Sequence, residues 1–159
     1  MIGSFDRLGY ERHRRTFRPA DLDADLSDRH VVVTGANSGL GFATATALVV
    51  RGARVMLVCR DGGRGEAARD AIRSQTGSSS VELAVVDVSD LSAVRSFAAG
   101  LRWPRVDRLI HNAGLLPDRR ILSSDGHELT FATHVLGPHL LTRLLRPRLE
   151  ASAEARVVW

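Results

Sequence analysis

The sequence contains no lysine, and it has a single cysteine and a single tyrosine among its 159 residues. Because Cys59 has no second cysteine to pair with, an intrachain disulfide is excluded and nothing indicates an oxidising compartment. No apolar run approaches the roughly 20 residues that a membrane-spanning helix requires. Residues 1–18 also lack the apolar core of a signal peptide. These absences predict a cytoplasmic protein without a transmembrane segment.

The missing lysines leave arginine as the only strongly basic residue, and the formal net charge is +4. The arginines are scattered along the chain, and their densest cluster comprises Arg12, Arg14, Arg15 and Arg18. Aromatic residues make up only 5% of the chain and no DNA-binding motif accompanies the cluster. We therefore interpret the cluster as solvated charge and expect no nucleic-acid partner. The histidines show no metal-ligand spacing with acids or cysteine, which predicts no metal site.

The length and the hydrophobic content of 44% suit one domain with a sizeable core. We divide the chain into an N-terminal extension, residues 1–27, and a domain, residues 28–159. In the extension a short helix is predicted over residues 9–18, stopped by Pro19 and followed by the acidic residues Asp21, Asp23 and Asp25. We expect the extension to lie over the domain surface as an anchor or partner contact, with disorder as the alternative.

Within the domain, apolar strand patterns alternate with helical patterns. Strands are predicted over residues 31–34, 54–60, 81–86 and 106–111, with a fifth beginning at residue 156. Helices are predicted over residues 40–51, 65–76, 91–101 and 125–149, with Ser89 as the N-cap of the third and a bend at Gly137–Pro138 in the fourth. Apolar strands that alternate with helices indicate a parallel sheet covered on both faces. The expected fold is α/β, a Rossmann-type doubly wound sheet truncated within strand five.

A glycine-rich turn between the first strand and the first helix is the most informative motif of the sequence. We expect Gly35 to form the tight turn, Gly39 to let the backbone approach a phosphate, and Gly41 to let the helix pack near the strand. A strand, a glycine turn and a helix N-terminus together favour a pyrophosphate ligand, because backbone N–H groups and the helix dipole both face it. The alternative interpretation is a glycine-rich surface turn without a ligand.

The end of the second strand bears on which dinucleotide is bound. An acidic residue there would bind the ribose hydroxyls of NAD, whereas an arginine pairs with the 2′-phosphate of NADP. Arg60 occupies this place, with Arg64 nearby to assist, so we predict NADP. Asp61 comes one residue later and keeps the use of NAD open. In the alternative interpretation, Arg60 only pairs with Asp61 on the surface.

The run T-G-A-N-S-G-L-G, residues 34–41, resembles the coenzyme turn of the short-chain dehydrogenase/reductase family. The run H-N-A-G, residues 111–114, resembles the N-N-A-G motif of that family, and Asp87 stands where the family binds the adenine amino group. Parts of the extension and residues 57–61 look like the dehydrogenase/reductase member 12 subgroup. The resemblance implies these cofactor-binding residues: Thr34, Gly35, Asn37, Ser38, Gly39, Leu40, Gly41, Arg60, Asp87, Val88, Asn112, Ala113 and Gly114.

Three positions of this resemblance have alternative interpretations. Asp87 is also typical of a turn or a helix cap, and Asn112 is also suited to brace the sheet. Residues 125–138 resemble the family segment in which a helix places an asparagine in the active site, but His134 occupies that place here. His134 either keeps the backbone role of the asparagine without its side-chain role, or is a histidine on a core-facing helix that a neighbour satisfies.

The chemistry that the resemblance implies is hydride transfer between a nicotinamide and a small carbonyl or alcohol substrate. In the family a tyrosine, a lysine four residues later and a serine carry it, and they follow the fifth strand. This chain ends at Trp159 inside that strand, its only tyrosine is Tyr10, and it contains no lysine. We therefore expect the cofactor-binding portion of an NADP-dependent oxidoreductase, with weak NADPH binding and, without a catalytic proton donor, no turnover alone.

Two other hypotheses stay open. The chain is a non-catalytic nucleotide-binding module or pseudoenzyme that acts with a partner chain, or it is a product that never folds well. The resemblance also implies that the helix over residues 125–149 contributes to a dimer interface, which makes a second copy of the chain a further expected partner. A carbonyl or alcohol substrate is expected only for a chain that contains the catalytic residues.

Overall fold

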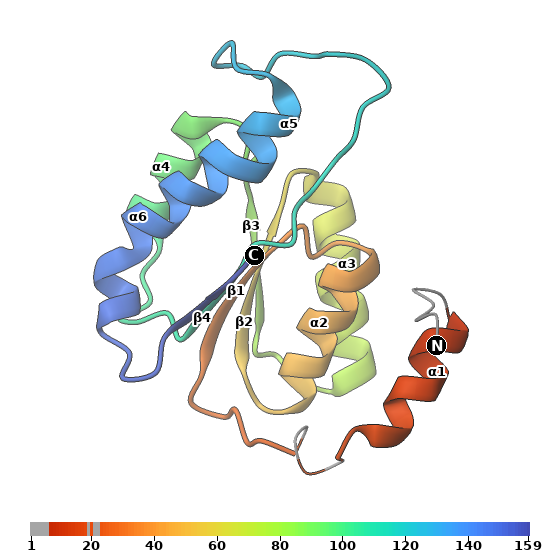
Figure 1. The fold of residues 1–159 in the computed structure, drawn as a ribbon. Helices are drawn as coiled ribbons and strands as arrows, with labels where there is room; N and C mark the ends of the chain where they lie inside the picture. Colours follow the sequence, from red (N-terminus) through yellow and green to blue (C-terminus); the bar gives the residue numbers. More distant parts are fainter. Residues whose placement is uncertain (1–6, 19, 21–22) are drawn as a thin grey trace.

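A single five-stranded parallel sheet forms the centre of the protein (Figure 1). The computed structural model describes residues 7–18, 20 and 23–159. The strands are β1 (His30–Thr34), β2 (Arg54–Cys59), β3 (Val81–Val85), β4 (Arg108–Ile110) and β5 (Arg156–Val158). The helices are α1 (Arg7–His13), the 3-10 turn η1 (Arg14–Thr16), α2 (Gly39–Val50), α3 (Gly62–Thr76), α4 (Leu91–Gly100), α5 (Leu129–Phe131), the π-helical segment η3 (Ala132–Leu136) and α6 (Gly137–Glu150). No helix in the described part of the chain is long and apolar enough to cross a membrane.

The strand order β3-β2-β1-β4-β5 confirms the predicted doubly wound sheet. Strand β1 is central, and Val32 pairs in parallel with Met56 of β2 on one side and with Leu109 of β4 on the other. The order reverses next to β1, since the chain first builds the half with β2 and β3 and then crosses to β4 and β5. In such sheets a ligand binds at the carboxyl ends of the strands beside this reversal.

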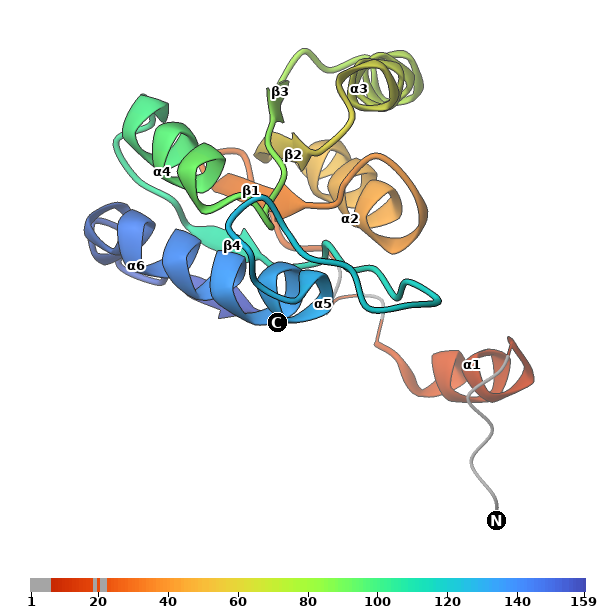
Figure 2. The ribbon, with the colours of Figure 1, turned by 90° about the horizontal axis from the view of Figure 1, so that it is seen from above.

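The alternating side chains of the strands build two separate cores, one on each face of the sheet. Val31 and Val33 pack in the core that contains Ala45 of α2 and Ile72 of α3. Val32 packs in the opposite core, with residues of α4 and α6 such as Val94 and Leu145. Figure 2 shows these two helical layers on either side of the sheet. Because both faces are covered, the inner strands β1 and β2 contain continuous apolar runs, as the sequence pattern predicted.

One predicted helix start and one predicted N-cap are wrong, because an aspartate directly before each helix accepts the N–H groups of its first turn. Helix α3 begins three residues before the predicted start, since the Asp61 carboxylate accepts the backbone N–H of Arg64. Helix α4 is capped by Asp90, which accepts the N–H groups of Ser92 and Ala93, and not by Ser89. Side chains of this kind satisfy the unpaired N–H groups of a first turn.

The fourth predicted helix differs most from the structure, because residues 125–128 are not helical. The Glu128 carboxylate accepts the N–H groups of Thr130 and Phe131 and so starts α5. The π-helical segment η3 then connects α5 to α6. The chain continues through Gly137 in right-handed helical conformation, and the π-helical widening η3 directly precedes the glycine at which a bend was predicted. Strand β4 is also shorter than predicted, spanning Arg108–Ile110 alone.

The N-terminal extension contains the predicted short helix, although it begins and ends earlier than expected. Figures 1 and 2 show α1 beside the three layers of the domain and not within them. Pro19 and Asp21, which the sequence analysis singled out, lie outside the described residues. Closer to β1 the chain joins the domain, because Leu26 packs against the core and its N–H donates to the carbonyl of Arg51.

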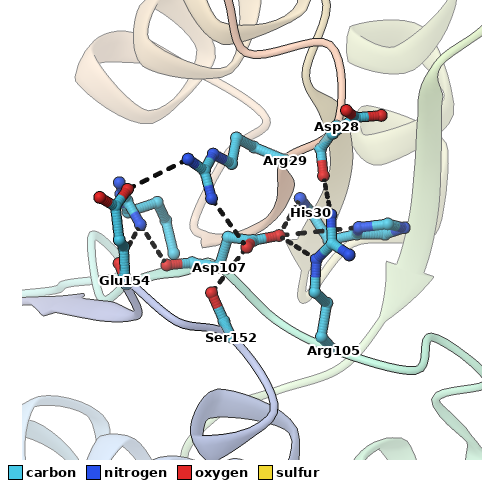
Figure 3. Close-up of polar contacts among 8 residues, drawn as sticks. Asp28, Arg29, His30, Arg105, Asp107, Ser152 and Glu154 are labelled. Atoms are coloured by element: carbon cyan, nitrogen blue, oxygen red, sulfur yellow. Dashed lines mark hydrogen bonds and ion pairs between the residues drawn. The ribbon is translucent and has the colours of Figure 1, made fainter.

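A buried carboxylate, Asp107, links the segments at the amino-terminal ends of the strands (Figure 3). One of its oxygens accepts the backbone N–H of His30 at 2.8 Å and the Nε–H of Arg105 at 3.2 Å. The other accepts the Ser152 hydroxyl at 2.7 Å and lies 3.5 Å from Arg29 Nη1. Burial alone would raise the pKa of Asp107, but these hydrogen bonds and the charge of Arg105 outweigh it and lower the pKa to about 2. The group is therefore ionised in the folded protein.

Gly137 is the point of closest approach between α6 and the loop after β3. A Cβ atom at Gly137 would lie 1.9 Å from the carbonyl oxygen of Val88. No side chain fits at that distance, and the obstacle is backbone on both sides. The sequence pattern suggested a bend at this glycine, whereas its observed role is to let a helix and a loop touch.

We predict that Gly137→Ala lowers the free energy of unfolding by about 3 kcal/mol, because the helix and the Val88 loop must move apart. Urea denaturation of the 159-residue chain measures the change. The matched control is Gly100→Ala at the end of α4, where a Cβ would meet no atom within 4 Å. The control should leave the stability unchanged or raise it by up to about 1 kcal/mol. Equal effects of the two variants would refute the role assigned to Gly137.

We also predict an acid-sensitive contribution from Asp107. Its folded-state pKa lies below the ordinary value, so its contribution is fully present above about pH 4 and is lost as the pH falls toward about 2. The shift corresponds to about 2 kcal/mol. Unfolding free energies measured between pH 2 and pH 6 should fall less steeply for Asp107→Asn than for the wild type. A variant curve parallel to the wild-type curve would contradict the prediction.

Candidate nucleotide-binding site

A cleft of about 430 Å³ opens at the carboxyl ends of β1, β2, β3 and β4. This volume lies within the range of small-molecule sites in proteins. Its position is the one that the reversal of strand order predicts for a ligand. The cleft is lined by Gly35, Asn37, Ser38, Leu40, Val58, Arg60, Arg64, Val86, Asp87, Val88, Asn112, Ala113, Gly114, Leu115 and Thr133.

The glycine turn between β1 and α2 forms one wall of the cleft. Gly35 has φ of +65°, and a Cβ there would lie 2.7 Å from the backbone of Ala113. A Cβ at Gly41 would lie 2.5 Å from the carbonyl oxygen of Gly35, so this glycine lets α2 begin directly against the turn. Gly39 has φ of +56° but faces open space, since a Cβ at this position would have no atom within 4 Å. The three glycines thus differ in role, and only Gly35 and Gly41 are needed for packing.

The N-terminus of α2 at this wall has no side-chain cap. Ser38 occupies the N-cap position in extended conformation, but its side chain makes no capping hydrogen bond. Helices α3 and α4, in contrast, are capped by Asp61 and Asp90. The first-turn N–H groups of a helix need acceptors, and the positive end of its dipole favours an anion there. An anionic ligand in the cleft would supply the hydrogen-bond acceptors that no side chain provides for the first turn of α2.

Thr34 and Asn112 lock the ends of β1 and β4 together beneath the cleft. The Thr34 hydroxyl oxygen accepts the backbone N–H groups of Asn112 and Ala113, each at 3.0 Å. The Asn112 amide donates to the carbonyl oxygens of Thr34 and Gly35, each at 3.1 Å. These contacts are the sheet-bracing role that was the alternative for Asn112. Thr34 itself is buried and does not line the cleft.

Arg60 and Arg64 line the cleft where β2 ends and α3 begins, next to the glycine turn in the order of the strands. Both side chains are exposed, and within the described residues neither guanidinium has an acidic partner at ion-pair distance. The alternative ion pair with Asp61 is not formed, because the Asp61 carboxylate caps α3 instead. Two unpaired arginines make this part of the cleft suited to a second anionic group.

Asp87 lies at the cleft after β3 and makes a local turn. Its Oδ1 accepts the backbone N–H of Ser89 at 2.9 Å and the Ser89 hydroxyl at 2.7 Å. This is the turn arrangement that the sequence left open. Its Oδ2 makes no hydrogen bond within the described part of the chain, so an acceptor stays available beside the cleft.

His111 occupies the place of the first asparagine of the family motif, but it makes packing contacts and does not line the cleft. Its Nε2 lies 2.9 Å from the Thr142 hydroxyl, and its ring stacks on Trp159 with 4.5 Å between centroids. Burial lowers the pKa of His111 to about 4, so the ring is neutral near pH 7. His111 therefore packs α6 and β5 against β4.

The predicted cofactor residues all line the cleft except Thr34, Gly39 and Gly41. Thr34 ends β1 beneath the cleft, Gly41 packs against the turn, and Gly39 faces open space beside it. Val58, Val86, Leu115 and Thr133 line the cleft without having been proposed from the sequence. Val58 and Val86 sit at strand ends, which is a usable signal, whereas Leu115 and Thr133 reach the cleft only through the path of the loop and η3. His134 is exposed and does not face the core, although a neighbour, Leu115, contacts its ring.

Comparison with known proteins identifies the architecture that carries this cleft. Residues 29–159 match the model of the short chain dehydrogenases. The chain belongs to the short-chain dehydrogenase family. Its predicted likeness to the member 12 subgroup is confirmed, since it is 39% identical over 158 residues to dehydrogenase/reductase SDR family member 12 of Bos taurus. That match covers 99% of this chain and 50% of the relative.

Solved structures share the fold of this chain. An uncharacterised protein from Mycobacterium paratuberculosis is 43% identical with a TM-score of 0.72, covering 83% of this chain and 46% of that one. A metagenomic short-chain oxidoreductase in complex with NADP is 30% identical with a TM-score of 0.73, covering 84% of this chain and 62% of that one. The chain thus spans about half the length of the curated relative that it matches.

We predict that Asn112→Ala destabilises this short-chain dehydrogenase chain by about 2 kcal/mol, because two carbonyl oxygens lose their shared donor. Chemical denaturation followed by circular dichroism measures the loss. Asn37→Ala removes the same amide from the cleft wall, where the described residues give it no hydrogen bond. This control should stay within about 0.5 kcal/mol of the wild type. A small effect of Asn112→Ala would mean that the brace adds nothing to stability.

Proposed function

We propose that the chain is the NADP(H)-binding portion of a short-chain oxidoreductase. The observation that carries the proposal is the presence of two anion-suited features in one cleft. The uncapped N-terminus of α2 follows β1, and the unpaired Arg60 and Arg64 follow the neighbouring strand β2. A dinucleotide with a pyrophosphate and a 2′-phosphate presents two anionic groups to match.

The pyrophosphate is assigned to the glycine turn. Backbone N–H groups at the start of α2 would donate to its oxygens, and the positive end of the helix dipole would stabilise its charge. Gly39 has no Cβ atom and faces open space, so its backbone leaves this approach free. Ser38 and Leu40 flank the same wall.

The 2′-phosphate is assigned to Arg60, with Arg64 as a second donor. A guanidinium binds a phosphate through two parallel N–H groups, which gives both affinity and orientation. NAD carries a hydroxyl at this place and would gain much less from two arginines. Asp87, with one free carboxylate oxygen, is suited to accept a hydrogen bond from the amino group of the adenine. The NADP in the complex of the metagenomic relative supports this choice of cofactor.

The reaction proposed for the protein to which this portion belongs is hydride transfer to or from a carbonyl or alcohol. The nicotinamide supplies the hydride chemistry when it is bound. A proton donor is also needed, and the family resemblance assigns that role to a tyrosine assisted by a lysine. These 159 residues contain no lysine, and their only tyrosine lies in α1, beside the domain. We therefore expect these residues alone to bind the nucleotide without turning over a substrate.

Fluorescence titration of the chain with NADPH and NADH tests the cofactor assignment. We expect NADPH to bind at least about tenfold more tightly, because a charge-assisted hydrogen bond contributes roughly 1.5–3 kcal/mol. Arg60→Ala should remove most of this preference by weakening NADPH binding while leaving NADH binding almost unchanged. The control Arg146→Ala removes an exposed arginine of α6, far along the chain from the cleft residues.

Two outcomes would count against the proposal. Equal affinities for NADPH and NADH, unchanged in Arg60→Ala, would refute the assignment of the 2′-phosphate. An absence of binding of either nucleotide to the folded wild-type chain would refute nucleotide binding as the function of the cleft. Gly35→Val should abolish both affinities, since its side chain would collide with the backbone of Ala113.

A further inference from the structure

A second pocket, of about 390 Å³, lies between α4 and α6. It is lined by Arg95 of α4 and by His139, Leu140, Arg143 and Leu144 of α6. None of these residues lines the nucleotide cleft. Figures 1 and 2 show α4 and α6 side by side, and Figure 2 shows them on the face of the sheet opposite to α2 and α3. We call this site the α4–α6 pocket.

The two guanidinium groups of the α4–α6 pocket have no acidic partner. Arg95 and Arg143 are exposed, and among the residues that the structure describes no carboxylate lies within ion-pair distance of either one. In contrast, Arg146 of the same helix pairs with Glu150, with 2.6 Å between Nε and Oε1. His139 lies four residues before Arg143, so both side chains share one face of α6. Two cations and an imidazole thus line one pocket, and no acidic residue in the described part of the chain lines it with them.

This arrangement is electrostatically unfavourable as long as the pocket holds no anion. Arg95 and Arg143 come from different helices and line the same space, so their charges repel each other. An anion between them would replace this repulsion by attraction. A phosphate monoester carries about 1.5 to 2 negative charges near pH 7, which matches two guanidinium groups. Arginine also binds phosphate through two parallel N–H groups, and a neutral imidazole still offers one N–H donor.

An apolar floor lies beside these donors. Leu140 and Leu144 are one turn apart on α6, and both are half-buried because they pack against the core cluster of that face. The parts of their side chains that stay accessible line the pocket. An inorganic anion would leave this apolar surface in contact with water, whereas a ligand with a short hydrocarbon chain would cover it. The volume of the pocket also falls within the range of small-molecule sites.

We propose that the α4–α6 pocket binds a soluble phosphate monoester that carries a short apolar substituent. Arg95 and Arg143 bind the phosphate from the two helices, and His139 donates a further hydrogen bond. The substituent packs on Leu140 and Leu144. The site is separate from the nucleotide cleft, so it does not depend on the proposed function.

A second copy of the chain is the competing occupant of this face, since the family resemblance implies a dimer contact for this helical segment. In a symmetric dimer the same patch meets itself, so the unpaired arginines of one copy would face those of the other. Like charges across an interface are unfavourable, and the described residues that line the pocket supply no carboxylate to offset them. Charge complementarity therefore favours an anion over a second copy.

An NMR titration of the chain with hexyl phosphate tests the site, because amide signals report each region separately. We expect saturable shifts at Arg95 and at residues 139–144. Hexyl phosphate should bind at least about tenfold more tightly than inorganic phosphate, since burial of two methylene groups suffices for that factor. Hexanol, which lacks the anion, should give no saturable shifts. The amides of Ser38 and Gly39 report any binding of phosphate at the glycine turn.

Variants of the two arginines test which groups bind the phosphate. Arg95→Gln and Arg143→Gln should each weaken the binding of hexyl phosphate about tenfold, because each removes a charge-assisted hydrogen bond. The matched control is Arg146→Gln, which makes the same change at an arginine of α6 that already has an acidic partner. This control should leave the affinity unchanged. Arg60→Ala, which changes the nucleotide cleft, should leave the shifts at residues 139–144 unchanged.

Four outcomes would overturn the proposal. The first is shifts confined to the glycine turn, and the second is equal affinity for hexyl phosphate and inorganic phosphate. The third is unchanged affinity in both folded glutamine variants. The fourth is a dimer of the ligand-free chain in sedimentation, with residues 139–144 covered and hexyl phosphate excluded, which would assign the face to a second copy. Binding to phosphatidic acid vesicles without binding of hexyl phosphate would likewise replace the soluble ligand by a lipid headgroup. The comparison of hexyl phosphate with hexanol uses the wild type alone, so it decides the case even if a variant does not fold.

Discussion

The hydrogen bonds between Thr34 and residues 112–113 are the contacts on which the candidate site depends. They fasten the carboxyl end of β1 to the carboxyl end of β4, and the Asn112 amide at the same time holds the carbonyl oxygen of Gly35. The glycine turn is therefore supported from a segment that lies 77 positions away in the sequence. Without this support, the turn would have to keep its left-handed glycine conformation through local contacts alone. The cleft is in this sense built on the β1–β4 pair.

The same strand pair is fastened at its other end by Asp107. The buried carboxylate binds the backbone at the start of β1 and the serine that precedes β5. It therefore fixes the amino-terminal ends of the strands, while Asn112 fixes the carboxyl ends of β1 and β4. Its negative charge is matched by arginines on two different segments. A buried charge is stabilising only when such partners are in place, which makes this edge dependent on several distant residues at once. Asp107 and Asn112 together fix the register in which β1 pairs with β4.

The sequence was sufficient for the fold and for most of the cleft wall, because those features follow from local patterns. Apolar strands that alternate with helices imply the parallel sheet, and the glycine spacing locates the turn. The role of Asp107 was not predicted, since its partners are spread from Arg29 to Ser152 and no local pattern marks them. For a related reason the cap Asp61 was not predicted, and Ser89 was predicted in the place of the cap Asp90. Several polar residues precede each helix, and only the three-dimensional path of the chain decides which one reaches the free N–H groups.

The central place of β1 has a kinetic consequence. The half-sheet formed by β1, β2 and β3 is contiguous in the chain, but β4 joins it only after the α2, α3 and α4 crossovers have been made. Pairings between distant segments are slow to form because the intervening loop must first be closed. The floor of the cleft is thus absent from any partly folded state in which β4 is undocked. A ligand that contacts both the glycine turn and the loop after β4 binds only after β4 has docked, which is late in folding. Its main effect is therefore to slow unfolding and not to speed folding.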